Sequence, residues 1–233
     1  MGNHSWPSGT IVWADFQTAG RGRMGRSWQA PSAEALLFSV LLDLQSATLP
    51  PTAYTFLAAL AVYYGIGRLN VPLSPAIKWP NDILIDNRKV CGILAQTRLN
   101  ADPPAVIIGI GVNVNQSPSF FRDDRAAGIS LAMAAGQTLD RQTVLVAILL
   151  ALDEMLGRYC SAGLPEILQE WKRYCVGLGK PVEVTDGRHR YSGIFTDVGP
   201  RGEMCLRDQR GRIRSFFAAD VTIVKGEKDD TGD

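Results

Sequence analysis

The stretch "AIKWPNDILIDNRKVCGILAQTRL", residues 76–99, decides the fold class of this chain. It contains two apolar runs on either side of "DNRK", a pattern that predicts a β-hairpin. A further strand, "AVIIGIGVNVN" at 105–115, follows it, and "ALLFSVLLD" at 35–43 is apolar enough to be a strand buried on both faces. Strands in hairpin order, without strict alternation with helices, indicate an α+β fold rather than a doubly wound one.

Helices are predicted between and after these strands. One begins near Thr52, a strongly amphipathic one covers about 141–160, and "LPEILQEWKRYC" continues as a second short helix. Near Gly177 the pattern changes to short strands separated by turn signals, which predicts a small barrel packed on a larger domain. We therefore expect a mixed sheet with flanking helices, followed by a small β-barrel.

The composition is that of an ordinary globular protein. The chain has 233 residues, of which 46% are hydrophobic and 20% charged, and its formal net charge of +1 gives no global attraction to nucleic acid. The four cysteines show no C-x-x-C spacing, and only two histidines accompany them, so a structural zinc site is not expected. No signal peptide is found at the start, and the longest apolar run, at 144–152, is too short to span a bilayer. We expect a cytoplasmic protein without a membrane segment.

A glycine-rich loop, "QTAGRGRMGRSW" at 17–28, follows the first predicted strand. Its glycines have the G-x-G-x-x-G spacing of a dinucleotide-binding turn, but the required helix cannot start after them, because "RSWQAPSAE" is too short and contains Pro31. Three arginines spaced by glycines suit a flexible clamp for phosphate oxygens, and Trp28 adds an aromatic plane for a base. A solvated basic loop and an RNA-binding arginine-glycine element are the alternatives.

Three further motifs combine polar residues with glycines. "KWPND" at 78–82 forms either a simple hairpin corner or a turn whose amide and carboxylate face a magnesium-bound triphosphate. Lys89 in "KVCGIL" is either a charge that protects a strand edge or a fixed cation beside a reacting phosphate. In "GIGVN" at 109–113 both glycines lie on one face of a strand, which produces either a ligand slot or a close strand crossing.

Together, "GRGRMGRSW", "KWPND", "KVCGIL" and "GIGVNVN", in this order and at these separations, closely resemble the biotin protein ligase family, the biotin–[acetyl-CoA-carboxylase] ligases. The resemblance implies a catalytic domain related to class II tRNA synthetases at 1–175, an SH3-like domain at 176–225 and a polar tail at 226–233. No helix-turn-helix segment precedes the ligase block, so we expect a monofunctional enzyme that does not bind DNA.

The resemblance also implies the reaction and its partners. Biotin and Mg-ATP are substrates, with no prosthetic group, and they form biotinyl-5′-AMP and pyrophosphate. The amine of one lysine on the biotin carboxyl carrier domain of acetyl-CoA carboxylase then takes the biotinyl group and releases AMP. A lipoate or octanoate ligase is one alternative, and a protein that binds biotin, its adenylate or RNA without turnover is another.

Residue roles follow from the matched positions. Lys89 and Arg23 are the expected catalytic residues, and Asp82 is the side chain that could face the magnesium ion. The expected biotin-binding residues are Gln17, Gly20, Arg21, Lys89, Gly92, Gly109 and Gly111. The expected ATP- and adenylate-binding residues are Arg23, Arg26, Trp28, Asn81, Asp82 and Asn113.

Two departures from the family pattern stand out. The family carries a Ser/Thr-x-Asn element some twenty residues before "DFQTAGRGR", and only "MGNHSWPSGTIVWA" precedes that block here, so we expect a truncated catalytic domain that lacks part of the biotin wall. Met24 stands where a charged or aromatic residue is common, which marks a tolerant position. Edge strands of the main sheet would allow a homodimer.

Overall fold

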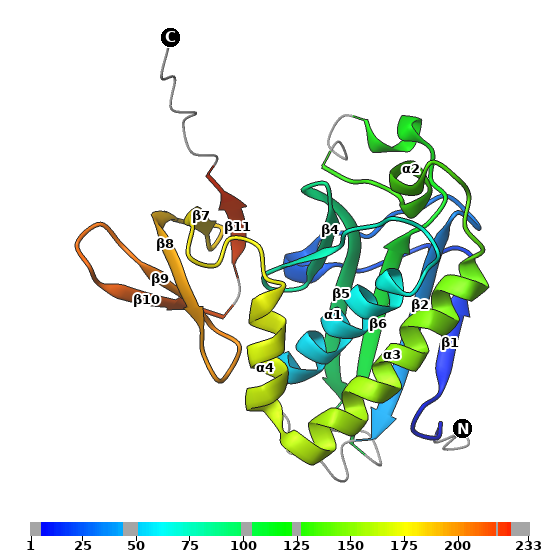
Figure 1. The fold of residues 1–233 in the computed structure, drawn as a ribbon, viewed down its shortest axis with the longest axis horizontal. Coiled ribbons are helices and arrows are strands. Elements are labelled where there is room, and N and C mark those ends of the chain that lie inside the picture. The colour runs from blue at the N-terminus through cyan, green and yellow to red at the C-terminus, as the bar shows by residue number, and fades with distance from the viewer. Residues whose placement is uncertain (1–5, 44–50, 99–103, 123–126, 218, 225–233) are drawn as a thin grey trace.

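The computed structural model describes residues 6–43, 51–98, 104–122, 127–217 and 219–224, and the predicted tail at 226–233 lies outside them. Six of the described strands form one sheet in the order β1-β2-β6-β5-β4-β3, and five form a second in the order β10-β9-β8-β7-β11. Figure 1 shows the larger sheet behind the main helices and the smaller sheet beside it. The predicted α+β class is confirmed.

The strands of the larger sheet pair with antiparallel neighbours throughout. Among the residues that the structure describes, the parallel component expected of a mixed sheet consists of isolated bridges, which join Ile77 to Cys175 and Lys89 to Gly128. The strands are β1 Ile11–Ala14, β2 Ala35–Asp43, β3 Ala76–Lys78, β4 Asp82–Ile85, β5 Arg88–Arg98 and β6 Ala105–Asn113.

The predicted hairpin at 76–99 is confirmed and lies at the centre of the site described below. β4 and β5 are joined by Asp86 and Asn87, which both have positive φ, 50° and 58°. A two-residue turn with two positive φ values matches the twist of the flanking strands, and Asn and Asp tolerate that conformation better than most residues. β5 then pairs with β6 so that Gly92 lies opposite Gly111.

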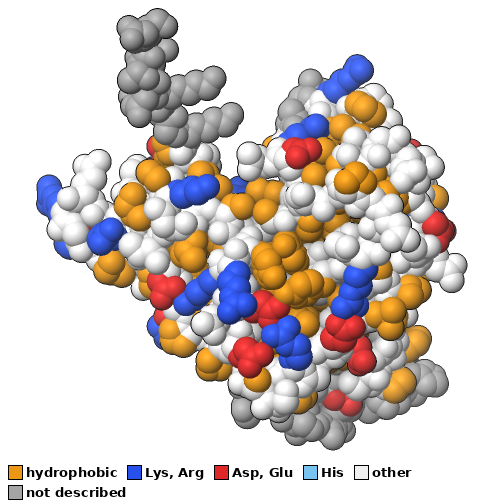
Figure 2. Space-filling model, in the orientation of Figure 1, with side chains coloured by type: hydrophobic (Ala, Val, Ile, Leu, Met, Phe, Trp, Pro, Cys, Tyr) orange, Lys and Arg blue, Asp and Glu red, His pale blue; other side chains and the backbone are white. Residues whose placement is uncertain are grey.

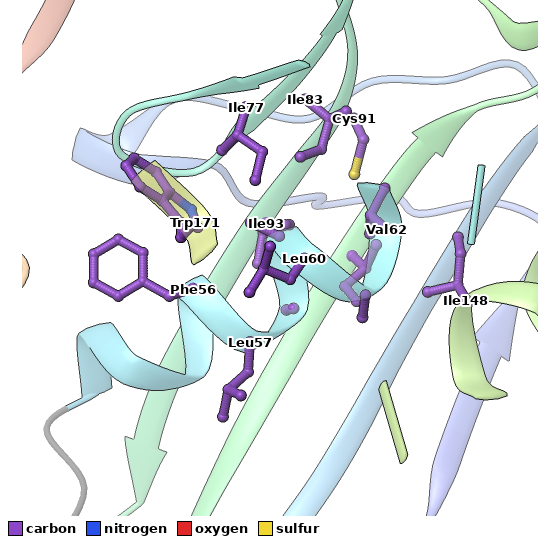
Figure 3. Close-up of a cluster of buried hydrophobic side chains, with 14 of the residues drawn as sticks. Phe56, Leu57, Leu60, Val62, Ile77, Ile83, Cys91, Ile93, Ile148 and Trp171 are labelled. Carbon is purple, nitrogen blue, oxygen red and sulfur yellow. The ribbon is translucent and has the colours of Figure 1, made fainter. Parts of the chain in front are cut away.

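The helices are α1 Pro51–Gly67, the short α2 Leu131–Ala135, α3 Arg141–Ala162 and α4 Leu164–Arg173. Of these, α1 and α3 cover one face of the larger sheet, and α4 packs against both of them. Residues 58–62 of α1 are fully buried, so this helix is covered on every side. Figure 3 shows its side chains among those of β5, α3 and α4. An added Cβ at Gly65 would lie 2.7 Å from Ile148 Cγ1, so this glycine lets α1 and α3 pack closely.

The predicted amphipathic helix at 141–160 is α3. Its first turn is capped by Asp140, whose carboxylate accepts a hydrogen bond from the Thr143 backbone N–H at 2.7 Å. Figure 2 shows basic and acidic side chains next to one another over the helix-bearing face, in keeping with the net charge of +1. Ion pairs from Arg158 of α3 to Glu166 and Glu170 of α4 are examples.

The smaller sheet is antiparallel and agrees with the predicted SH3-like barrel. Its strands are β7 Pro181–Thr185, β8 Arg190–Val198, β9 Met204–Arg207, β10 Ile213–Phe216 and β11 Asp220–Ile223. The exact domain boundary near residue 176 stays a prediction.

Specific contacts fix the smaller sheet against the larger one. Buried Trp79 donates its indole N–H to the Gly202 carbonyl at 3.0 Å, and Thr52 donates to the Arg201 carbonyl at 2.9 Å. Gly202 has a φ of +85°, and an added Cβ there would lie 2.8 Å from the Phe56 ring. The turn between β8 and β9 therefore fits closely against the start of α1, and the smaller sheet is held where β11 reaches the larger sheet's open face.

Candidate functional site

A cavity of about 480 Å³ lies on the sheet face opposite α1, a volume typical of small-molecule sites. Side chains alternate along β5 and β6, so Ile93, Ile108 and Ile110 enter the core while the intervening residues face the cavity. Its floor is formed by Leu37, Ser39, Gly92, Leu94, Gly109 and Gly111. The 17–28 loop, the 78–82 corner and residues 219–222 form its walls.

The 17–28 loop is a closed, hairpin-like loop. The Trp28 N–H donates to the Gly20 carbonyl at 2.9 Å, and the Gly22 N–H donates to the Arg26 carbonyl at 2.7 Å. At its tip, Met24 and Gly25 both have positive φ, 53° and 75°. Only one 3-10 turn, Arg23–Gly25, occurs within the loop. The structure thus supports the rejection of the dinucleotide-binding interpretation.

The indole of Trp28 lies directly on two glycines of the floor. An added Cβ would lie 2.6 Å from Trp28 Cε2 at Gly111 and 2.9 Å from Cζ3 at Gly92. At Gly109 the nearest atom beyond the chain neighbours would be the Leu94 carbonyl oxygen at 3.6 Å, an ordinary contact. The slot expected from the glycines therefore exists, and Trp28 occupies its Gly92–Gly111 part while the Gly109 part stays open.

Cations gather around this slot, each beside an anionic or amide partner. Lys89 Nζ lies 2.6 Å from Asp82 Oδ1 and 5.4 Å from the centroid of the Trp28 ring. Arg23 donates to the Asn81 amide oxygen at 3.3 Å. Burial lowers the pKa of Arg23, and the charges of Asp82 and Asp220 partly oppose that shift. The cavity is thus lined by fixed positive charge, as a site for phosphate or carboxylate oxygens requires.

Arg26 has a partner in the smaller sheet. Its guanidinium donates to the carboxylate of Asp220, at the start of β11, and this hydrogen bond raises the pKa of Arg26. Sequence reasoning missed Asp220 and the cavity wall around it. "AADVTIV" is an ordinary strand pattern, and no signal in it indicates that the strand reaches a distant loop.

Most of the predicted site residues line this one cavity. They are Gln17, Arg21, Arg23, Arg26, Trp28, Asn81, Asp82, Lys89, Gly92, Gly109 and Gly111.

Two predicted residues lie beside the cavity lining. Gly20 packs so tightly against the Trp28 carbonyl oxygen that a side chain there would collide with it, so this glycine shapes the loop. Asn113 is 5% exposed, donates to the Lys89 carbonyl at 3.3 Å and accepts from Gln116 at 3.0 Å. Its predicted contact with adenine stays a prediction, and its observed role is to fix the backbone of Lys89.

Within 6–43, 51–98, 104–122, 127–217 and 219–224, no helix is long and apolar enough to cross a membrane. In the same part of the chain, no three His, Cys, Asp or Glu side chains gather as a metal-binding group.

Comparisons with known proteins agree with these motifs. The model of the biotin/lipoate A/B protein ligase family matches residues 1–113. The chain is 35% identical over 225 residues to the bifunctional ligase/repressor BirA of Bacillus subtilis, which covers 96% of this chain and 69% of that protein. It is 31% identical over 221 residues to the biotin–[acetyl-CoA-carboxylase] ligase of Mycobacterium tuberculosis, covering 93% and 80%.

A solved structure resembles the whole described fold. The biotin protein ligase of Aquifex aeolicus, in complex with biotin and ATP, superimposes with a TM-score of 0.81 at 25% identity, over 94% of this chain and 91% of that one. The ordered motifs, the cation-lined cavity and the similarity along nearly the full chain lead to one conclusion. The chain belongs to the biotin protein ligase family.

Proposed function

We propose that this protein joins biotin to one lysine of the carboxyl carrier domain of acetyl-CoA carboxylase, through a biotinyl-5′-AMP intermediate. The observation that carries the proposal is the convergence of Arg23, Arg26 and Lys89 on one cavity with a glycine floor. Those cations suit a reaction in which negative charge builds up on phosphate oxygens. The names of the relatives indicate biotin as the acid and acetyl-CoA carboxylase as the acceptor protein.

In the first step, a carboxylate oxygen of biotin attacks the α-phosphorus of Mg-ATP, and the bond to pyrophosphate breaks. Lys89 is the cation for the carboxylate and α-phosphate, and Arg23 and Arg26 bind phosphate oxygens. Loss of one such donor typically costs about 10²–10³-fold in rate. Asp82 is the carboxylate that fits the magnesium ion of the nucleotide, since Mg²⁺ needs only one or two carboxylates when phosphates and waters complete its shell.

In the second step, the neutral amine of the acceptor lysine attacks the carbonyl carbon of the anhydride. An amide bond forms, the carbon–oxygen bond to the phosphate breaks, AMP leaves with the electron pair, and the proton that the amine loses passes to solvent. The 17–28 loop covers the cavity on the side of Trp28. A closed loop keeps water from the anhydride until the acceptor lysine arrives.

The test is incubation with biotin, Mg-ATP and a purified carrier domain, followed by intact mass measurement. We expect one biotinyl group on the carrier, and biotin-dependent exchange of pyrophosphate into ATP. Lys89→Ala should lower both rates about 10²–10³-fold. Lys172→Ala is the matched control, because Lys172 also has a carboxylate partner at 2.6 Å but lies on α4, outside the cavity lining.

The alternatives predict different outcomes of the same experiment. Transfer of lipoate or octanoate, without transfer of biotin, would identify a ligase for another acid. Retention of biotinyl-5′-AMP without transfer would identify a binding protein. Absence of both exchange and transfer with all three acids would refute the proposed reaction class.

A further inference from the structure

The hydrogen bond between Arg26 and Asp220 joins parts of the chain that are 194 residues apart. Arg26 belongs to the 17–28 loop, while Asp220 begins β11 and pairs in register with Thr185 of β7. The strand therefore holds the carboxylate at a fixed place. The loop contributes the partner that can move.

The tip of the same loop also lies close to the smaller sheet. Met24, at the loop tip, extends to the turn between β7 and β8, where an added Cβ on Gly187 would lie 3.8 Å from Met24 Cε. Met24 and Arg26 both line the cavity, as do Ala219, Asp220 and Val221. The smaller sheet thus supports the loop at its tip and at Arg26.

The charges explain why the loop needs this support. Arg21, Arg23 and Arg26 lie within six residues and repel one another when no anion is near. Asp220 supplies a negative charge to Arg26, and its charge also partly opposes the lowering of the Arg23 pKa by burial. In this position the carboxylate presents to the loop the same kind of oxygen that a phosphate would present.

We propose that Asp220 is a positioning residue, which holds the 17–28 loop closed through Arg26 until phosphate oxygens of the ligand replace its carboxylate. The loop closure itself is independent of the proposed function, whereas the exchange of carboxylate for phosphate rests on it. The C-terminal sheet thereby sets how often the empty site is open.

The size of the effect follows from exposure. The side chains of Arg26 and Asp220 are 63% and 39% exposed, so the pair is partly screened by water and salt. Exposed pairs of this kind change an equilibrium by up to about fivefold. Asp220→Asn keeps the shape and removes the charge, so it should open the empty loop up to about fivefold more often at low salt.

Limited trypsin digestion tests how often the loop opens. Mass spectrometry measures the rate of cleavage after Arg21, Arg23 and Arg26. Without ligand at low salt, Asp220→Asn should be cut up to about fivefold faster than the wild type. The difference should disappear at about 1 M salt, where the Debye length is only about 3 Å. Asp208→Asn is the matched control, because Asp208 pairs with Arg212 and Arg214 in the same sheet and does not line the cavity.

Addition of biotin with Mg-ATP tests whether phosphate oxygens replace the Asp220 carboxylate at Arg26. Bound ligand should slow cleavage of the wild type and of Asp220→Asn to the same rate, because phosphate then holds Arg26 in both. If trypsin cuts the wild type and Asp220→Asn at equal rates without ligand at low salt, Asp220 does not hold the loop closed and the proposal is wrong. If the cleavage rates of the wild type and Asp220→Asn differ as much with ligand as without it, phosphate does not replace the Asp220 carboxylate. If the ligand slows trypsin cleavage of neither protein, the proposed function fails. The ligand-free comparison still tests whether Asp220 holds the loop closed.

Discussion

Replacing Gly111 by alanine tests the packing of Trp28 on the cavity floor. The new Cβ would lie 2.6 Å from Trp28 Cε2 and 2.9 Å from Nε1, whereas carbon atoms in favourable contact are about 3.5–4.0 Å apart. β6 cannot yield, because Gly111 is paired with Leu37 of β2 on one side and Gly92 of β5 on the other. The indole must therefore move by about 1 Å or leave the floor.

The expected change in the free energy of unfolding is the difference between two effects. Overpacking of a fitted site costs about 1–3 kcal/mol. Alanine also restricts the unfolded chain, which stabilises a protein by about 0.4–1 kcal/mol where the backbone tolerates it, and Gly111 is not a glycine with positive φ. The net expectation is a loss of up to about 2.5 kcal/mol, and each kcal/mol lowers Tm by about 2–4 °C in a chain of this length.

Gly109→Ala is the internal control, on the same strand and the same face. Its Cβ would meet only the Leu94 carbonyl oxygen at 3.6 Å and Ser39 Oγ at 3.8 Å, so Tm should stay constant or rise slightly. The assay is thermal unfolding of both variants, each in the wild-type and the Trp28→Ala background. Removal of the indole should abolish the loss caused by Gly111→Ala, which is a coupling that a double-mutant cycle measures.

Two results would refute the reasoning. One is equal Tm values for Gly111→Ala and Gly109→Ala. The other is a loss from Gly111→Ala that is as large in the Trp28→Ala background as in the wild type. Either result would mean that the indole does not rest on this glycine in solution.

Three further predictions concern charge. Lys89→Ala should lower biotin-dependent pyrophosphate exchange about 10²–10³-fold with an unchanged circular dichroism spectrum, and a loss below about tenfold would contradict its phosphate role. Arg23→Gly should release adenylate that labels bystander lysines, which peptide mapping detects; labelling confined to the acceptor lysine would argue against the loop as a cover. Burial opposes ionisation of Glu170, but Arg158 and Tyr64 outweigh it and hold its pKa below the ordinary value. This stabilisation is present above the unfolded pKa of about 4.3 and is lost as pH falls through the folded pKa. The Tm gap between wild type and Glu170→Gln should therefore close in acid, and a gap independent of pH would show that the carboxylate is not the cause.

Sequence patterns were sufficient wherever a local signal determines the structure. The hairpin at 76–99 followed from two apolar runs around a short polar turn, and Asp86 and Asn87 have the backbone that such a turn demands. Alternation along β6 placed Gly109 and Gly111 on one face, where the cavity lies. The arginines of the 17–28 loop also line that cavity, because the spacing of its glycines and arginines limits what else the loop can form. Lys89 lines the same cavity from β5.

Tertiary packing decided the rest. Asn113 was expected to bind the adenylate, yet Gln116 and the Lys89 carbonyl use hydrogen-bonding groups of its amide. The two glycines were expected to form either a ligand slot or a close strand crossing, but the Trp28 indole packs on Gly92 and Gly111 and sets the size of the slot. Trp79 was interpreted as part of a turn, and its buried indole in fact anchors the second sheet through Gly202. Apart from Gln116, which lies three residues after Asn113, these partners are 24 or more positions apart, so no local pattern could indicate them.

The long separation between Arg26 and Asp220 also affects how the protein is made. Chains emerge from the ribosome at about 5–20 residues per second, so roughly 10–40 s pass between synthesis of these two residues, which lie 194 positions apart. During that interval the nascent chain carries the arginine loop without its counter-charge and without the last wall of the cavity. The complete site can assemble only after β11 has been synthesised, because Asp220 and its neighbours form one wall of the cavity.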